Sequence, residues 1–374
     1  DFQASYAFDQ YDKSDYQPIT KLDIRDYSNV QNSLRLLYNH RFDRGDVLTI
    51  GSDFMHDYLY NTNLENETRN QNTWDLFGQY DWRISDQWEA VGAVRYDYFS
   101  DGKESHVTPK LNVCYKPIYN LSIRAGYGMG FRAPTLKEKY YNFDMAGIWI
   151  VEGNANLKSE VSHNFNLSAE YTKGHYNLTG SVYYNKVKNK LATSVPYFKT
   201  PNDKLPYLPY ANLDDYSVCG GEIGAQAKWN NGLGARLTYA YTKEQLAKDK
   251  DGHTINNQYI PAREHALNAR VDFDKQLSKK YGLNIALQGR VLSGVENVEY
   301  KDYYDVSKGT ITVEYPAYTI WKLSVVQRVG NAVKVTAALD NVFGYKPKYY
   351  YLNSPITDGV NFQIGMSIDI DKLF

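Results

Sequence analysis

The chain has 374 residues and a formal net charge of −1, with 42 Lys and Arg against 43 Asp and Glu. This balance excludes the strongly basic surface of nucleic-acid-binding proteins, so we expect no nucleic-acid partner. No apolar run approaches the ~18 residues that a transmembrane helix needs, which excludes a helical membrane span. Aromatic residues make up 15% of the chain, with 36 Tyr, 6 Trp and 14 Phe, although the mean hydropathy of −0.59 is that of a polar protein.

Taken in chain order, the sequence opens with an extended aromatic segment over 2–11, and we expect the polar stretch that follows to be a loop reaching Ser28. Beyond it, most segments alternate between apolar and polar residues. In 160–172, for example, Phe165 and Leu167 alternate with Asn166 and Ser168. A period of two residues places the two sets on opposite faces of a β-strand.

The alternation predicts sixteen strands. We expect them over 2–11, 29–41, 46–60, 73–84, 88–99, 106–116, 121–127, 160–172, 176–187, 218–229, 233–243, 264–274, 282–292, 316–329, 332–342 and 361–370. Short turn signals, such as Lys173-Gly174 and Asn230-Asn231-Gly232, alternate with longer connections. The longer connections include 99–105, 188–217, 244–263 and 343–360.

Strict alternation of short turns and long loops is typical of an outer-membrane barrel, where periplasmic turns are short and extracellular loops are long. In such a barrel the apolar side chains face the lipid and the polar side chains face the lumen, which reconciles a polar composition with a membrane location. The fold class that we predict is therefore all-β: a transmembrane antiparallel up-and-down β-barrel with about sixteen strands in this chain. We expect 1–374 to form a single barrel domain.

One irregular stretch, 126–160, interrupts this pattern. It begins with three alternate glycines, continues through the tetrapeptide Phe131-Arg132-Ala133-Pro134, and ends after Asn154-Ala155-Asn156-Leu157. Between these tetrapeptides lies a cluster of aromatic and apolar residues that is too irregular to predict a strand or a helix. A long aromatic loop on a repetitive scaffold is a typical place for binding residues.

The two tetrapeptides resemble the paired FRAP and NPNL boxes of TonB-dependent outer-membrane receptors. The first box matches in full. The second departs from the family pattern, which usually has proline where this chain has Ala155 and often where it has Ser159. The resemblance implies a receptor in the outer membrane of a Gram-negative bacterium.

The resemblance also sets expectations for the rest of the receptor. Relatives have barrels of ~22 strands with a plugged lumen, so we expect this chain to be the C-terminal part of such a barrel, without the plug. It implies outer-membrane lipid and the TonB complex, reached through the plug, as partners, and a surface lipoprotein as a further one. The alternatives are a passive sixteen-strand porin or channel, or a surface adhesin.

The residues between the boxes are the candidates for ligand binding. They are Arg132, Tyr140, Tyr141, Asp144, Met145 and Trp149. Arg132 has two interpretations: its planar guanidinium clamps an anionic group of a ligand, or it pairs with Glu138, Glu152 or Glu160 and holds the loop in shape. We favour the second interpretation.

The transported ligand is expected to be an iron complex, either haem or a ferric siderophore, with cobalamin and oligosaccharide as alternatives. Haem receptors that resemble this chain often carry a histidine between the boxes, and this chain has none from Phe131 to Leu157. Methionine also serves as an axial haem ligand, which makes Met145 the candidate metal ligand. The alternative is that Met145 packs within the loop.

No catalytic motif is present. The sequence contains no nucleophile elbow, Walker loop, HExxH or CxxC pattern, so we expect no enzymatic activity and no intrinsic cofactor. The two cysteines, Cys114 and Cys219, are expected to be isolated residues.

Overall fold

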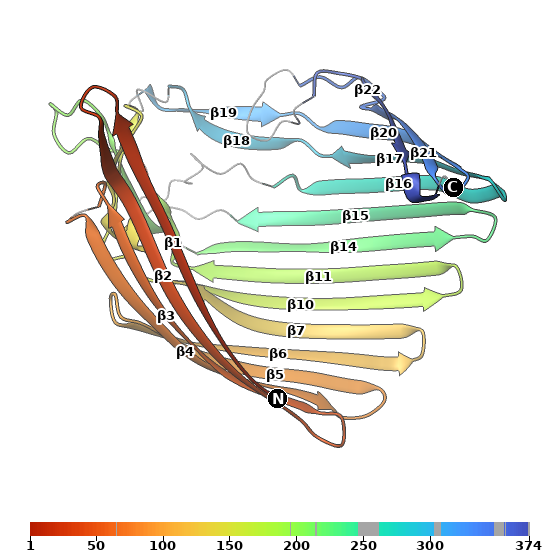
Figure 1. The fold of residues 1–374 in the computed structure, drawn as a ribbon, viewed down its shortest axis with the longest axis horizontal. Coiled ribbons are helices and arrows are strands. Elements are labelled where there is room, and N and C mark those ends of the chain that lie inside the picture. The colour runs from red at the N-terminus through yellow and green to blue at the C-terminus, as the bar shows by residue number, and fades with distance from the viewer. Residues whose placement is uncertain are drawn as a thin grey trace.

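The structure, a computed structural model, describes residues 1–64, 66–194, 196–213, 215–245, 262–302, 308–347, 355 and 357–372. Sixteen antiparallel strands form one sheet in which the strands follow each other in chain order (Figure 1). The first seven are β1 (Phe2–Gln17), β2 (Leu22–Arg41), β3 (Val47–Asn61), β4 (Thr68–Arg83), β5 (Trp88–Phe99), β6 (Glu104–Ile118) and β7 (Leu121–Arg132). The other nine are β10 (Glu160–Lys173), β11 (Tyr176–Lys188), β14 (Tyr216–Lys228), β15 (Leu233–Gln245), β16 (His265–Ser278), β17 (Tyr281–Leu292), β20 (Tyr318–Val329), β21 (Val333–Asp340) and β22 (Asn361–Ile368). The predicted number of strands and their antiparallel order are confirmed.

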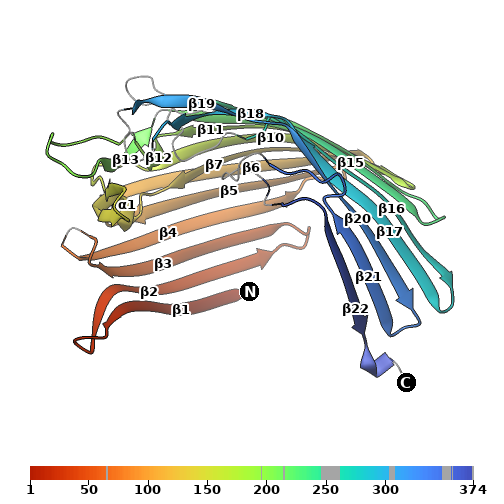
Figure 2. The same ribbon diagram turned by 90° about the horizontal axis from the view of Figure 1, so that it is seen from above.

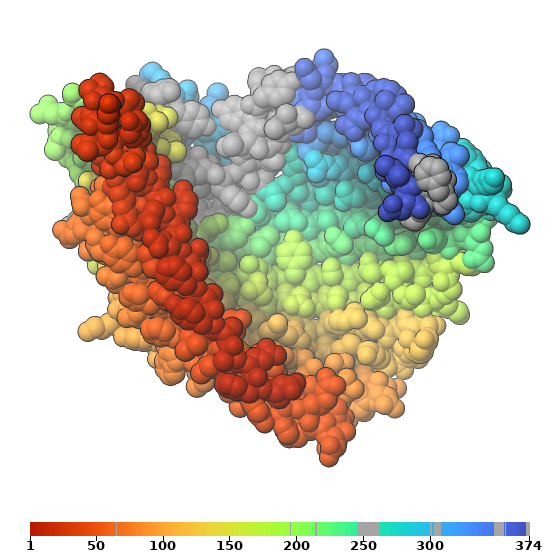
Figure 3. Space-filling model, viewed as in Figure 1, coloured from red at the N-terminus to blue at the C-terminus, as the bar shows by residue number. Residues whose placement is uncertain are grey.

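The sheet is strongly curved and open. Seen from above, it forms an arch with β1 along one side and β22 along the other (Figure 2). These two strands are the edges of the sheet: β1 pairs with β2 and β22 with β21. Figure 3 shows the hollowed face of the arch between the N-terminal and C-terminal strands. Among the described residues, β1 and β22 do not pair with each other.

The two faces of the sheet differ as the alternation predicts. On one face, apolar side chains such as Phe165, Leu167 and Ile364 remain about half exposed or more. The other face carries polar side chains, and several of these, including Thr73 and Asp97, are buried. Side chains converge on the inside of a curved sheet, so we assign the less exposed polar face to the hollow and the apolar face to the outside.

The connections at the two ends of the sheet also differ. The tight connections 42–46, 84–87, 119–120, 174–175, 229–232, 279–280 and 330–332 gather at one end, which we call the turn end. Both chain termini lie there, since Asn39 N–H donates to Asp1 O and Asp369 N–H donates to Ala332 O. The longest connections, 133–159, 189–215, 246–264, 293–317 and 341–360, each leave and rejoin the sheet at the opposite end, which we call the loop end.

Two sequence predictions about connections were wrong. β1 continues to Gln17 and β2 begins at Leu22, so the stretch expected to be a loop is a long hairpin. Cross-strand ion pairs stabilise this hairpin, with Lys13 Nζ 2.6 Å from Asp26 Oδ2 and Arg25 bound to Asp12. The connection between β5 and β6 is also short, because β6 already begins at Glu104.

Small elements build the loop end. A short helix, α1 (Leu136–Tyr140), precedes the hairpin β8 (Asn142–Met145) and β9 (Trp149–Glu152). This hairpin joins β12 (Lys190–Thr193) and β13 (Tyr207–Leu213) in a four-stranded sheet of order β12-β13-β9-β8. A separate hairpin comprises β18 (Val295–Tyr300) and β19 (Thr310–Tyr315). The stretch that was expected to be too irregular for helix or strand therefore contains both.

No helix in the described part of the chain is long and apolar enough to cross a membrane. Cys114 and Cys219 are free cysteines.

Candidate functional site

The first box begins inside a strand and ends in a capped turn. Phe131 and Arg132 are the last residues of β7, and Pro134, which has no backbone N–H, follows where the ladder stops. The Phe131 ring stacks on the His106 ring at a centroid distance of 4.3 Å and an interplanar angle of 18°. The box is therefore anchored on the sheet wall.

Thr135 and Glu138 form a capping box at the start of α1. Glu138 N–H donates to Thr135 Oγ1 at 3.1 Å, and Thr135 N–H donates to Glu138 Oε2 at 2.8 Å. This reciprocal arrangement satisfies two backbone donors that a helix start otherwise leaves unpaired. Leu136 then packs into a buried cluster with Leu59 and Leu64, which attaches the helix to the β3–β4 connection.

Arg132 holds the loop in shape. Its Nη1 donates to both oxygens of Glu138 at 2.8 and 3.0 Å, and its Nη2 donates to Leu191 O at 3.3 Å. The Glu160 carboxylate lies 3.7 Å from Nη2. Glu152 takes a different partner, because Lys199 Nζ lies 2.6 Å from Glu152 Oε1. The guanidinium thus makes the contacts that the loop-shaping interpretation requires.

Lys139 and Tyr140 bind one carboxylate of a neighbouring connection. Lys139 Nζ donates to Asp101 Oδ2 at 2.8 Å, and Tyr140 OH donates to Asp101 Oδ1 at 3.0 Å. Lys139 is only 5% exposed, so this is a buried ion pair. Tyr140 also lies beneath the Arg69 guanidinium, 4.1 Å from the ring centroid. Its side chain is occupied by contacts within the protein.

Tyr141 connects α1 to the β3–β4 connection. It forms a β-bridge with Leu64, and Asn61 Nδ2 donates to its hydroxyl at 3.3 Å. Like Tyr140, it therefore joins two loop-end segments.

The β8–β9 hairpin carries the other three candidates. Ala146 and Gly147 take positive φ angles of 52° and 74° in its turn, as a tight hairpin requires. Asp144 Oδ1 accepts a hydrogen bond of 2.7 Å from Gly147 N–H, which fixes the turn. Met145 lies opposite Trp149 in the ladder. Trp149 is 7% exposed and packs with Val151 and Leu208, whereas Met145 is 44% exposed.

The second box joins this loop to the next one. Asn154 Nδ2 donates to Tyr210 O at 3.2 Å, and Leu157 is buried. Asn212 completes the joint: its Oδ1 accepts from Lys158 N–H at 2.8 Å and its Nδ2 donates to Lys158 O at 2.8 Å. β9 and β13 also pair in parallel.

A close backbone approach explains the glycine before the second box. A Cβ atom at Gly153 would lie 2.6 Å from the backbone nitrogens of Tyr140 and Tyr141. Any other residue here would push the box away from the end of α1.

The six candidates therefore do not converge on one cavity. Tyr140, Tyr141 and Trp149 are held within the loop-end structure, Arg132 is exposed but bound to Glu138, and Asp144 and Met145 lie open at the hairpin tip. Phe143, two residues before Met145 on the same strand, is also exposed. Within the described ranges, no group of three or more His, Cys, Asp or Glu side chains is placed to hold a metal ion.

A hollow of about 640 Å³ lies beneath the first box, on the polar face. Phe131, Ala133 and Pro134 form part of its lining, and Arg95 and Asp97 of β5 line it as well. A second hollow of about 360 Å³ adjoins it and shares Arg95. Sequence reasoning considered only the loop and did not identify these hollows beneath it.

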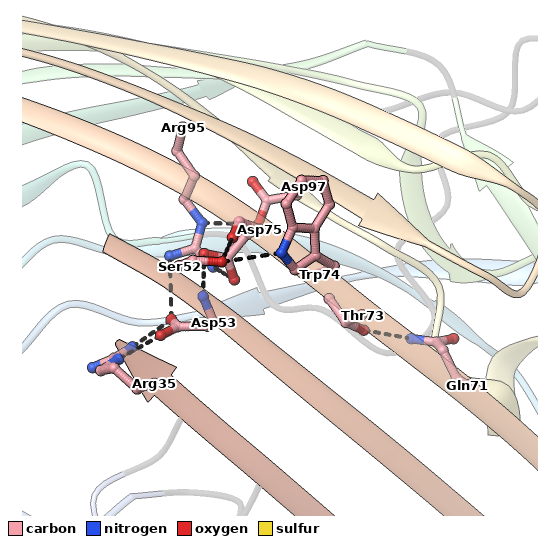
Figure 4. A network of polar contacts seen from close by, with 9 residues as sticks. All are labelled: Arg35, Ser52, Asp53, Gln71, Thr73, Trp74, Asp75, Arg95 and Asp97. Carbon is pink, nitrogen blue, oxygen red and sulfur yellow. Dashed lines mark hydrogen bonds and ion pairs between the residues drawn. The ribbon is translucent and has the colours of Figure 1, made fainter. Parts of the chain in front are cut away.

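A row of carboxylates lies along these hollows (Figure 4). Asp53, Asp75 and Asp97 lie directly opposite one another in β3, β4 and β5. Arg95 donates to Asp75 and to Asp97, each at 2.8 Å, and Arg35 donates to both oxygens of Asp53 at 2.7 Å. Directly opposed like charges destabilise a sheet unless they are compensated, and the two arginines provide that compensation. The Arg-x-Asp spacing of β5 is visible in the sequence, but the alignment of three aspartates depends on strand register.

The chain is similar to known outer-membrane proteins. Residues 1–342 match the family model described as TonB dependent receptor-like, beta-barrel. An iron-regulated outer membrane virulence protein of Vibrio cholerae is 22% identical over 334 residues, covering 86% of this chain and 49% of the relative. The vitamin B12 transporter BtuB of Photobacterium profundum is 21% identical over 350 residues, covering 91% of this chain and 52% of the relative.

A solved structure has the same fold. The FrpB iron transporter from Neisseria meningitidis superposes with a TM-score of 0.73 at 16% identity, covering 98% of this chain and 60% of that one. The chain thus spans about half the length of the curated relatives that it matches.

Proposed function

The chain belongs to the family of TonB-dependent receptor-like β-barrels, and on that premise we propose that it is part of an outer-membrane receptor that takes up an iron complex. The family places the chain in the outer membrane of a Gram-negative bacterium and is one of transporters rather than enzymes. The match over residues 1–342 carries this proposal. Because this match is to a receptor family, it argues against the alternative that the sixteen strands form a passive porin.

Iron is favoured over other cargo because two of the proteins described above are named for it, the iron-regulated protein of Vibrio cholerae and the FrpB iron transporter. Haem and a ferric siderophore remain the two candidate forms. The relative named for vitamin B12 supports cobalamin as the second candidate. No observation favours an oligosaccharide.

The open edges of the sheet support a larger barrel in the membrane. Within the described part of the chain, β1 and β22 each have one neighbouring strand, and an unpaired strand edge is not stable against lipid because its backbone groups lack hydrogen-bond partners. We infer that further strands close the barrel and that a plug fills it. TonB would then act through that plug, and a surface lipoprotein at the loop end stays a prediction.

The loop end is the proposed place of ligand capture. The linked elements α1, β8, β9, β12 and β13 hold the exposed hairpin tip, with Phe143 and Met145, above the hollow under the first box. A rigid support of this kind lowers the entropy that a binding surface loses when a ligand arrives.

Growth on defined nutrients tests the proposal. A strain that lacks the gene is grown in iron-depleted medium with haem, a ferric siderophore or cobalamin as the only source of the limiting nutrient. We expect growth on one iron complex to require both this gene and a functional TonB. Loss of cobalamin-dependent growth alone would transfer the proposal to vitamin B12, and wild-type growth on every nutrient would contradict uptake.

A further inference from the structure

A groove on the apolar, outward face of the sheet crosses β6, β7, β10 and β11. Its volume is about 480 Å³, within the range of ~300–1,000 Å³ that is typical of ligand pockets. We call it the outer groove. Figure 1 shows its four strands side by side in the middle of the sheet. Because the outer groove lies on the outside of the arch, it is separate from the hollow interior.

The outer groove exists because one small side chain interrupts a set of large ones. Ala125 of β7 lies directly opposite Val113 of β6 and Leu167 of β10. Nearer the loop end, the rings of Tyr127 and Phe165 lie beside it with their centroids 4.9 Å apart. All five side chains line the outer groove. The single methyl group of Ala125 leaves a depression between its larger neighbours.

Strand β11 shows the depth of the outer groove in the membrane. Tyr176 and Tyr184 are both exposed on the apolar face, and they span about nine residues, the length of a tilted strand that crosses a membrane. Tyrosines at both ends of such strands form the aromatic girdles of an outer-membrane barrel. Tyr184 also lines the outer groove. The outer groove therefore reaches the girdle nearer the loop end.

Positive charge follows this girdle on its loop side. Lys186 and Lys188 are the next two residues of β11 on the same face as Tyr184. His163 of β10 lies directly opposite Lys186, and its Nδ1 lies 3.0 Å from Tyr127 OH. Lipid headgroups lie outside the hydrocarbon core, at the level where β11 changes from apolar to cationic.

One carboxylate compensates these lysines in part. Lys186 Nζ lies 2.8 Å from Asp215 Oδ2, and both side chains are exposed to solvent on the model surface by more than a third. Lys188 is exposed and makes no ion pair with any residue that the structure describes. Two lysines against one carboxylate leave the rim of the outer groove with a net positive charge, which complements a phosphate group.

A lipid fits the outer groove better than a second copy of this protein. The outer face of the sheet is convex (Figure 2), and two convex surfaces touch along a narrow strip without filling a depression. A flexible acyl chain fills such a depression, and the phosphate of the same lipid then lies at the level of the lysines. Apolar groove and cationic rim thus match the two ends of one molecule.

We propose that the outer groove binds one molecule of a phosphorylated glycolipid from the outer leaflet of the membrane. One acyl chain lies over Ala125, and a headgroup phosphate contacts Lys186 and Lys188. The loop end is expected to face the cell exterior, and lipid A is the phosphorylated glycolipid of that leaflet in a Gram-negative bacterium. This binding goes beyond nutrient uptake and does not depend on which nutrient is transported.

Native mass spectrometry of the intact protein, purified from outer membranes in detergent, tests the proposal. Lipid A is titrated and compared with phosphatidylethanolamine, which has acyl chains but no net charge. We expect one lipid A to be retained with about tenfold higher affinity, because charge-assisted contacts to phosphate are stronger than neutral ones. Inorganic phosphate, which has no acyl chain, is expected not to displace it. Displacement by inorganic phosphate would overturn binding through the groove.

Two variants separate the headgroup contact from the acyl contact. K186Q/K188Q removes both lysines and should weaken lipid A binding roughly 10- to 100-fold, since two charge-assisted contacts are lost. Ala125→Phe fills the outer groove without a change of charge and should weaken binding about tenfold, because apolar contact with the acyl chain is lost. Circular dichroism checks that each variant keeps its β-structure.

Matched controls make the same changes elsewhere. K279Q/K280Q removes two lysines from a turn-end connection, and Ala225→Phe adds the same ring on the apolar face of β14, opposite Leu178. Both controls are expected to leave lipid A affinity unchanged within about twofold. Equal weakening by the controls, equal retention of phosphatidylethanolamine, or no lipid A on the wild-type protein would overturn the proposal. A dimer that Ala125→Phe dissociates would overturn it as well, in favour of a second copy.

Discussion

The guanidinium of Arg132 donates hydrogen bonds of 2.8 and 3.0 Å to both carboxylate oxygens of Glu138. Arg132 is the last residue of β7, and Glu138 belongs to the capping box of α1. Their contact therefore sets the path by which the chain leaves the sheet. Arg132 also reaches the backbone of Leu191 in the next loop. The first box therefore helps to fix the shape of the loop end without any ligand.

Removal of this contact should loosen the loop without unfolding the sheet. Arg132→Ala and Glu138→Ala are each expected to increase proteolysis within 133–159, and a double-mutant cycle should give a coupling of about 0.5–1 kcal/mol, the range of well-formed exposed pairs. Limited proteolysis of the protein in outer-membrane vesicles measures the change. Additive effects in the cycle would show that the two side chains do not act together.

The buried pair of Lys139 and Asp101 should matter more. Asp101→Ala leaves a buried ammonium group without its carboxylate, and breaking one partner of a buried pair costs about 3–5 kcal/mol. We expect amide hydrogen exchange in α1 and in 100–103 to accelerate strongly, while exchange in β10 and β11 stays slow. Exchange in α1 equal to that of the wild-type protein would contradict the importance of the pair.

Charge on the apolar face should oppose membrane insertion. Leu167 is 50% exposed on this face, and Leu167→Arg is expected to cost roughly 2–4 kcal/mol of folding free energy if the residue lies near the bilayer midplane. The matched control is Ser181→Arg on the polar face, where the new side chain would lie opposite Glu222. Denaturant titration in lipid vesicles measures both variants, and equal costs would refute the assignment of the faces.

The loop end should be accessible from outside the cell. Protease added to intact cells is expected to cut within 133–159 and 189–215 and to spare the turns at Lys173-Gly174 and Asn230-Asn231-Gly232. Mass spectrometry of the released peptides identifies the sites. Cuts at the turns alone would invert the topology.

Met145 remains the most informative single position for haem. It is exposed at the tip of the β8–β9 hairpin, so it is accessible to a ligand. If its thioether is an axial ligand, Met145→Ala should shift the Soret band of the haem-loaded protein and weaken haem binding. Met366→Ala, on the apolar face of β22, serves as the control. An unchanged spectrum in Met145→Ala would exclude ligation while leaving uptake by the receptor intact.

The strands of the sheet were predictable because apolar and polar residues alternate along them with a period of two. Residues such as Leu167 and Ser168 take opposite faces of a strand that is lipid-exposed on one side, so apolar and polar positions alternate over the whole span. The outer part of the first hairpin, formed by β1 and β2, was not recognised because it does not follow this alternation. There, Lys13 and Asp26 pair across the strands, and charge replaces alternation as the stabilising contact.

The loop end was only partly predictable. The two boxes marked its limits, but strands as short as β8 leave too few residues for a period to show. The partners of the candidate residues come from distant parts of the chain, as Asp101 does for Tyr140 and Asn212 does for Lys158. Strand register, which aligns the aspartates of β3 to β5 and places Arg236 opposite Arg270, depends on turn geometry as well as on pattern.

Asn212 and the parallel pairing of β9 with β13 join 133–159 to 189–213. This connection also has an immunological consequence. A surface assembled from two chain segments exists only in the folded protein. Antibodies raised against a linear peptide of either segment should recognise the denatured chain and fail on living cells. A vaccine antigen directed at this surface would have to display both segments on a folded barrel.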